Sequence, residues 1–195
     1  MKTWFFLPII FLLTTPLFFT ACKKDPTKNA KLPPITQEGK NTVGFTINGE
    51  VWVPYYKCRF MGDPCGEILA RYGESGGAAP NGIDFGFGRE KGGKLSSSLT
   101  ISSAGTGTIT SMGDKIDSIG VTYDDNELSN DGYFIGPLSG SKFIITNIDF
   151  QNQIISGQFE LILRERKNDG TVTSNSIVLK DGRFDFRFNA CKCSR

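Results

Sequence analysis

From Thr42 to the C-terminus, short apolar runs alternate with clusters of glycine, asparagine and aspartate, the pattern of β-strands separated by turns. No stretch repeats apolar residues with the 3.6-residue period of a helix. Besides two hairpins, the pattern predicts six strands: Glu67–Tyr72, Ile83–Gly88, Leu95–Ile101, Ser118–Tyr123, Lys142–Phe150 and Ile154–Arg166. About ten short strands predict an all-β protein, an antiparallel β-sandwich or alternatively a small β-barrel.

The first hairpin is predicted at Asn48-Gly49, because both residues tolerate the positive φ of a two-residue turn. This turn pairs Phe45 with Trp52 and puts both on the same face as Ile47. We therefore expect Trp52 to pack in the core.

The second hairpin is predicted at Asp181-Gly182, for the same reason. With this turn, one face of the hairpin carries Ile177, Leu179, Phe184, Phe186 and Phe188. Asp185 falls on the opposite face, where we expect it to be solvated, like Asp84 and Glu160 on other strands.

The N-terminal residues resemble a lipoprotein signal peptide. A positive start is followed by an apolar run from Trp4 to Phe19 and by Thr20-Ala21-Cys22. The run is shorter than the roughly 20 residues of a spanning helix and contains prolines. The resemblance implies cleavage before Cys22 and acylation of its thiol, although Phe19 stands where such signals usually have leucine. The alternative is an ordinary secretory signal cut near Ala21.

This signal defines three parts of the chain: residues 1–21 as signal peptide, 22–41 as lipidated cysteine and flexible tether, and 42–195 as a single all-β domain. The tether is expected because residues 23–41 are polar, contain prolines and lack apolar periodicity. The expected location is the bacterial cell envelope, with a lipid anchor in the outer membrane and the periplasmic or surface face left open.

The remaining cysteines are even in number: Cys58, Cys65, Cys191 and Cys193. In an exported protein this predicts disulfides. A bridge between Cys191 and Cys193 would be strained, so we favour Cys58 and Cys65 each pairing with one of the C-terminal two. The alternative is a four-thiolate metal site, but the C-x6-C and C-x-C spacings are not those of common zinc sites.

Composition excludes several functions. The sequence has no histidine, which removes Ser-His-Asp and Cys-His catalysis and the histidine-based zinc proteases. Its net charge of only +2, with no basic stripe, argues against nucleic acid as a partner. We expect no cofactor and no catalytic residues, with a carboxylate-based glycoside hydrolase as the remaining enzymatic alternative.

A few residues are candidates for binding or modification. Tyr55 and Tyr56 follow a proline at a strand end and are candidates for ligand contact. The oxygen-rich run Asp124, Asp125 and Asn126 is a weak candidate for Ca²⁺, because its order does not match a calcium-binding loop.

Three stretches near the start of the domain resemble an uncharacterised lipoprotein family of Bacteroidota: Leu32–Gly39 (LPPITQEG), Asn41–Gly44 (NTVG) and Ile47–Pro54 (INGEVWVP). Near its end, Ile155–Glu160 (ISGQFE) and Asp181–Asp185 (DGRFD) are similar to the closing strands of that family. The resemblance implies a β-rich domain on a cell-envelope lipoprotein, with no known activity and no functional residues to transfer. Ser118, in Asp117-Ser118-Ile119, resembles an O-glycosylation site of this phylum.

These features together favour a non-catalytic binding module for glycan, envelope polymer or protein, attached to a membrane by lipid. The alternative is a structural function: the protein would be a subunit of an envelope assembly and would expose apolar surface to its neighbours.

Overall fold

The computed structural model describes residues 26–57, 66–72, 82–92, 94–103 and 119–192. These residues form eleven strands and no helix, so the prediction of an all-β antiparallel protein is confirmed. The strands are β1 (Thr42–Ile47), β2 (Glu50–Trp52), β3 (Ile68–Tyr72), β4 (Ile83–Lys91), β5 (Lys94–Ser103), β6 (Ile119–Asp125), β7 (Gly132–Gly136), β8 (Lys142–Asp149), β9 (Ile154–Lys167), β10 (Val172–Arg187) and β11 (Ala190–Lys192). Nowhere in the described ranges is there a helix long and apolar enough to cross a membrane.

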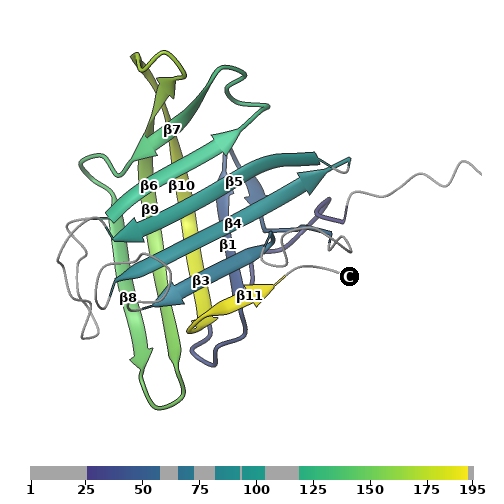
Figure 1. Ribbon diagram of the computed structural model, residues 1–195, viewed down its shortest axis with the longest axis vertical. Coiled ribbons are helices and arrows are strands. Elements are labelled where there is room, and N and C mark those ends of the chain that lie inside the picture. Colours follow the sequence, from purple (N-terminus) through teal and green to yellow (C-terminus); the bar gives the residue numbers. More distant parts are fainter. Residues whose placement is uncertain (1–25, 58–65, 73–81, 93, 104–118, 193–195) are drawn as a thin grey trace, which may run out of the picture.

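All eleven strands belong to one antiparallel sheet, in the order β11-β3-β4-β5-β6-β7-β9-β10-β1-β2, and β8 pairs with β9 beside this path. The sheet is strongly curled. In Figure 1, strands β3 to β6 run diagonally across the view and cross β8, β9, β10 and β1, which run nearly vertically. The two layers predicted for a sandwich are thus two parts of one curled sheet, whose arrangement approaches the alternative, a small barrel.

The core lies between the two parts of the sheet and is rich in aromatic rings. Phe85 on β4 contacts Phe184 on β10 with ring centroids 5.2 Å apart, and Phe87 stacks on Phe186 at 5.5 Å. Because β4 and β10 are far apart in the sheet order, these contacts hold the curled sheet closed.

The first predicted hairpin is confirmed. Phe45 on β1 pairs with Trp52 on β2, and the turn residues Asn48 and Gly49 have φ values of 51° and 82°. Trp52 is 1% exposed, and its ring stacks on Phe45 at 4.7 Å. Its prediction as a core residue is therefore correct.

The second predicted hairpin is wrong. Asp181 and Gly182 lie inside β10, which continues without turning from Val172 to Arg187. They form a β-bulge: the pairing with β9 shifts register between Leu179 and Gly182, and Asp181 has a φ of 53°. This bulge uses a left-handed residue, as a two-residue turn does, and both change the parity of the strand. The predicted apolar face is therefore still formed, with Ile177, Leu179, Phe184 and Phe186 buried and Phe188 packed against the core.

The six other predicted strands are present as β3, β4, β5, β6, β8 and β9, with ends that differ by up to three residues. Strands β7 and β11 were not predicted. Both are short, and β7 lies between glycines with only Phe134 buried, so neither shows apolar alternation along the chain.

Asp185 is buried, contrary to the expectation of a solvated side chain, because a segment of the expected tether covers it. The carboxylate is 1% exposed and accepts hydrogen bonds from the Oγ1 of Thr36 (2.6 Å) and the backbone N–H of Gly39 (2.8 Å). It also accepts from Ser156 of β9 at 2.8 Å. Residues 36–40 are therefore packed on the domain and differ from a free tether.

Candidate functional site

The inner face of strands β4, β5 and β6 changes from apolar to polar at one end of the sheet. Arg89 on β4 is the register partner of Ser97 on β5, and Ser97 is the partner of Asp125 on β6. Side chains two residues apart on a strand share a face. The preceding row of the same face is apolar or aromatic and consists of Phe87, Leu99 and Tyr123.

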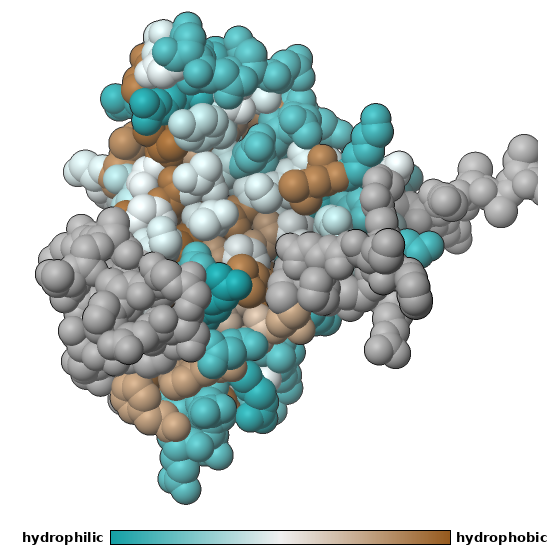
Figure 2. Space-filling view, in the orientation of Figure 1, coloured by the Kyte–Doolittle hydropathy of each residue, from teal (hydrophilic) through white to brown (hydrophobic). Residues whose placement is uncertain are grey.

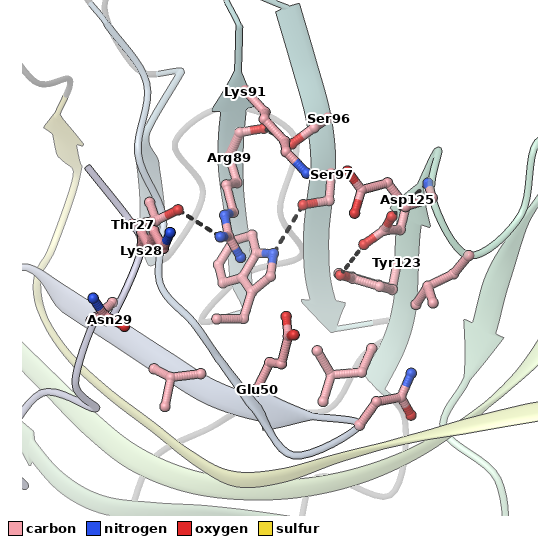
Figure 3. A pocket seen from close by; sticks show the side chains of 17 residues that line it. Thr27, Lys28, Asn29, Glu50, Arg89, Lys91, Ser96, Ser97, Tyr123 and Asp125 are labelled. Carbon is pink, nitrogen blue, oxygen red and sulfur yellow. Dashed lines mark hydrogen bonds and ion pairs between the residues drawn. The ribbon is translucent and has the colours of Figure 1, made fainter. Parts of the chain in front are cut away.

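This polar row lies in a pocket of about 670 Å³. Three parts of the chain form it: the segment Thr27–Ala30, the β1–β2 hairpin, and the adjoining ends of β4, β5 and β6 (Figure 3). Its polar lining residues include Thr27, Lys28, Asn29, Asn48, Glu50, Arg89, Lys91, Ser96, Ser97, Tyr123, Asp125 and Glu127.

A backbone contact of the segment after β2 helps to close the sheet near this end. The N–H of Tyr55 donates to the carbonyl of Gly88 at 3.0 Å, and the N–H of Glu90 donates to the carbonyl of Tyr55 at 2.7 Å. This parallel bridge brings the segment that follows β2 against β4, although β2 and β4 are seven places apart in the sheet order. The bridge therefore joins the two ends of the sheet beside Arg89.

Two internal hydrogen bonds fix the buried side chains of the pocket. The indole Nε1 of Trp52 donates to the Oγ of Ser97 at 2.9 Å, and the hydroxyl of Tyr123 donates to Oδ2 of Asp125 at 2.7 Å. Burial raises the pKa of Tyr123, and the hydrogen bond to Asp125 and its negative charge raise it further. The phenol therefore stays protonated and keeps the Asp125 carboxylate in place.

The charged groups of the pocket are only partly neutralised by one another. Lys91 forms an ion pair with Glu127, whereas Arg89 donates from Nη2 to the neutral hydroxyl of Thr27 at 2.5 Å. In the described part of the chain, no ion pair joins Arg89 to Asp125. Since one strand separates them, their Cα atoms are about 9–10 Å apart.

The row thus presents a donor on one side and an acceptor on the other. The Arg89 guanidinium has five N–H donors and uses one for Thr27. Each oxygen of Asp125 has two lone pairs, of which one accepts from Tyr123 or from the N–H of Glu127. The space between them suits a ligand with both donors and acceptors, such as neighbouring hydroxyl groups.

The tyrosines predicted to contact a ligand are not part of this pocket. Tyr55 and Tyr56 are half-buried, and neither lines it. Tyr55 contributes its backbone to the bridge with β4, and the ring of Tyr56 packs so closely on Gly66 that no Cβ would fit there.

The three weak calcium candidates do not converge. Asp124 is exposed on the outer face of β6, whereas Asp125 points inward to the pocket, because adjacent residues of a strand face opposite ways. Asn126 donates to the carbonyl of Leu95 at 3.4 Å. Across the ranges that the structure covers, no three histidine, cysteine or acidic side chains form a group that could hold a metal.

The predicted modification sites mostly lie outside the described residues: Cys22, Cys58, Cys65, Cys193 and Ser118. Cys191 lies on β11 and is a disulfide cysteine. The predicted pairing of Cys58 and Cys65 with the C-terminal cysteines stays a prediction.

Sequence reasoning did not single out Arg89 or Ser97. A local signal exists: the buried positions of β4 and β6 alternate up to Phe87 and Tyr123, and the next residue in phase is Arg89 or Asp125. That these polar ends adjoin each other depends on the register of three strands, which the local pattern does not specify.

Fold and pocket together define an all-β protein whose single curled sheet ends in a polar pocket. No protein-family model matches the chain, and no curated protein and no solved structure matches it at a significant level.

Proposed function

We propose that this protein is a non-catalytic binding module, attached by lipid to the bacterial outer membrane, and that its pocket binds a glycan. The observation that carries the proposal is the row Arg89, Ser97 and Asp125, which ends an otherwise apolar inner face and keeps donors and acceptors beyond its internal hydrogen bonds. Arg89 and Asp125 are half-buried, so their remaining donors and acceptors are open to a ligand in the pocket.

The size and chemistry of the pocket both support a glycan. Small-molecule sites usually measure about 300–1,000 Å³, and the pocket has about 670 Å³. Such sites are mostly apolar, whereas this one is lined mainly by hydroxyl, amide and charged side chains. Glycans expose many hydroxyl groups that both donate and accept, so they match this lining.

A non-catalytic role is supported by the hydrogen bonds and ion pairs that the carboxylate side chains make. A glycoside hydrolase needs one carboxyl group as an acid and another as a base or nucleophile. In the pocket, Asp125 is held by Tyr123 and Glu127 by Lys91. Asp185 is enclosed by hydrogen-bond donors elsewhere, and Asp84 lies 3.5 Å from Arg71. These four acids thus each have a structural partner, and Glu50, the remaining acid of the pocket, does not by itself make the pair that hydrolysis needs.

The proposed location depends on the N-terminal signal and on the resemblance to the Bacteroidota lipoprotein family. The disulfides belong to the same proposal, since an oxidising compartment favours them and Cys191 is a disulfide cysteine. Whether the domain faces the periplasm or the cell surface does not affect the argument from the pocket.

Calorimetric titration of the mature chain with a panel of envelope glycans tests the proposal. A glycan that binds should lose affinity at least about tenfold with Asp125→Asn, because one hydrogen bond to a charged group contributes about 1.5–3 kcal/mol. Asp124→Asn is the matched control, since it makes the same change on the outer face of the same strand. Equal losses in both variants, or no binding by any glycan, would contradict the proposal.

The alternative is a structural subunit of an envelope assembly. It is favoured by Phe150, which is 54% exposed and contacts the ring of Phe188, and by Ile144, which is 40% exposed on β8. On the face drawn in Figure 2, however, apolar surface is divided by polar side chains. Sedimentation of the mature chain distinguishes the two: self-association abolished by Phe150→Ser would support the subunit.

A further inference from the structure

The segment that would carry the lipid anchor also forms one wall of the pocket. Thr27, Lys28, Asn29 and Ala30 line it. Thr27 is 5% exposed and accepts the hydrogen bond from Arg89, so this wall is fixed to β4. Figure 3 shows Thr27 and Lys28 beside the Arg89 side chain, on the opposite side of the pocket from Asp125.

The distance from this wall to the membrane is limited by the length of the chain. Five residue steps separate Cys22 from Thr27. A fully extended chain covers at most about 3.3–3.6 Å per residue, so Thr27 can lie no more than about 18 Å from the acylated cysteine. The polar headgroup layer on each side of a bilayer is itself about 5–7 Å thick. The pocket must therefore lie close to the headgroups.

We infer that the pocket opens beside the membrane and binds the uncharged sugar headgroup of a membrane glycolipid. This inference rests on the proposed lipid anchor and on the proposed glycan site. It goes beyond them because it identifies the source of the glycan as the membrane to which the protein is attached.

The charges of the pocket support an uncharged headgroup. Its lining has equal numbers of cations and acids: Lys28, Arg89 and Lys91 against Glu50, Asp125 and Glu127. An anionic headgroup would gain from Arg89 but would be repelled by Asp125 and Glu50, whereas a sugar can donate to the acids and accept from Arg89. The equal numbers of positive and negative side chains therefore favour the hydroxyl groups of a sugar over a phosphate group.

A short tether also raises the effective concentration of a ligand in the same membrane. The headgroups diffuse freely in the plane of the membrane, so they are diluted only by the height over which the tether lets the pocket range. For a flexible tether that height grows as the square root of its length. An insertion of about 20 Gly/Ser residues between Lys24 and Asp25 would lengthen the five-residue tether about fivefold. The effective concentration of the headgroup at the pocket would then fall about twofold.

The test uses the lipidated protein in phosphatidylcholine vesicles, with native or lengthened tether. Trp52 is the only tryptophan after removal of the signal peptide and forms part of the pocket, so its emission reports on both position and occupancy. In vesicles that contain dansyl-labelled phosphatidylethanolamine, energy transfer from Trp52 should be strong with the native tether and weak with the long one. Equal transfer would overturn the location of the pocket.

The second arm replaces the dansyl lipid with glucosyl or galactosyl diacylglycerol. With the native tether, the change in Trp52 emission should reach half its maximum at about twofold less glycolipid than with the long tether. No response, while free glycans bind the unlipidated Cys22→Ser chain, would overturn the inference and leave the proposed function intact. Failure of the unlipidated chain to bind any glycan would instead contradict the proposed function.

Discussion

Glu165 and Asp185 are buried carboxylates, and each is surrounded by hydrogen-bond donors. Glu165 on β9 accepts from Lys167 at 2.8 Å, Ser129 at 2.7 Å and Thr173 at 2.9 Å. These bonds, led by that of Lys167, lower its pKa to about 2. Burial alone would raise the pKa of Asp185, but the hydrogen bonds from Thr36, Ser156 and the backbone outweigh burial and lower it. Both groups therefore stay charged in the folded protein.

The first prediction concerns stability in acid. Because the folded pKa of Glu165 lies below its ordinary value of 4.5, its contribution to stability is complete above about pH 4.5 and is lost as the pH falls toward 2. Asp185 acts in the same direction. The urea midpoint should fall across this range, and the fall should be shallower in Glu165→Gln. An identical slope in the variant would show that other groups cause the acid sensitivity.

The second prediction concerns Gly182, whose hydrogen faces the ring of Phe159. A Cβ at this position would overlap that ring. Gly182→Ala should therefore destabilise the protein by about 1–3 kcal/mol, the usual effect of an overfilled core, measured by urea unfolding. Gly86→Ala is the matched control on β4, because its Cβ would meet only Leu69 at an ordinary 3.7 Å. A neutral Gly182→Ala would mean that Phe159 can move aside.

At the scale of the element, β10 shows why a hairpin and a bulge are indistinguishable from local sequence. Asp181-Gly182 supplies a left-handed residue, and the apolar residues change parity across it, as in a hairpin. Whether the chain turns there depends on its neighbours. Strand β10 pairs with β9 and β1 on both sides of the bulge, so each half already has partners and gains nothing by folding back.

The third prediction follows from the left-handed backbone of Asp181. Asp181→Val should lower stability by about 1–2 kcal/mol, since a β-branched residue is unfavourable at a φ of 53°. Asp181→Gly should change stability by less, because glycine adopts this conformation freely. Thermal or urea unfolding measures both. If both variants lose stability equally, the hydrogen bond from Thr46 to the Asp181 carboxylate, at 3.3 Å, is the important contribution.

At the scale of the whole molecule, one sheet encloses one core. The cluster of buried apolar residues includes members of β1 to β11, among them Phe45, Ile68, Leu163 and Ala190. Aromatic contacts link strands at opposite ends of the sheet order, as between Phe85 and Phe184. Neither part of the sheet has a core of its own, so the parts are expected to unfold together.

The fourth prediction is therefore a single cooperative unfolding transition. Far-ultraviolet circular dichroism reports on all the strands, and the fluorescence of Trp52 reports on the pocket end of the core. In the oxidised mature chain both signals should give the same urea midpoint and slope. An earlier transition of Trp52 would show that the β1–β2 hairpin and the pocket open before the rest of the sheet.

The sequence by itself determined the class of fold, most of the strands and the burial of Trp52. These follow from alternation and turn residues, which act over a few neighbouring positions. The local signal at Asn48-Gly49 was sufficient because β2 lies at the end of the sheet order and pairs with β1 through this turn. The N-terminal signal and the cysteine count also come from sequence alone, and they remain the basis of the proposed location.

Only the tertiary structure decided the roles of Asp185, Asp181 and the pocket residues. The covering of Asp185 by Thr36 and Gly39 joins groups about 150 residues apart, and the pocket joins Thr27 with Arg89 and Asp125. Such contacts depend on strand register and on the curl of the sheet, which many weak interactions set together. A chain pattern specifies which face of a strand is buried, but the partner of each side chain is specified by the closed sheet.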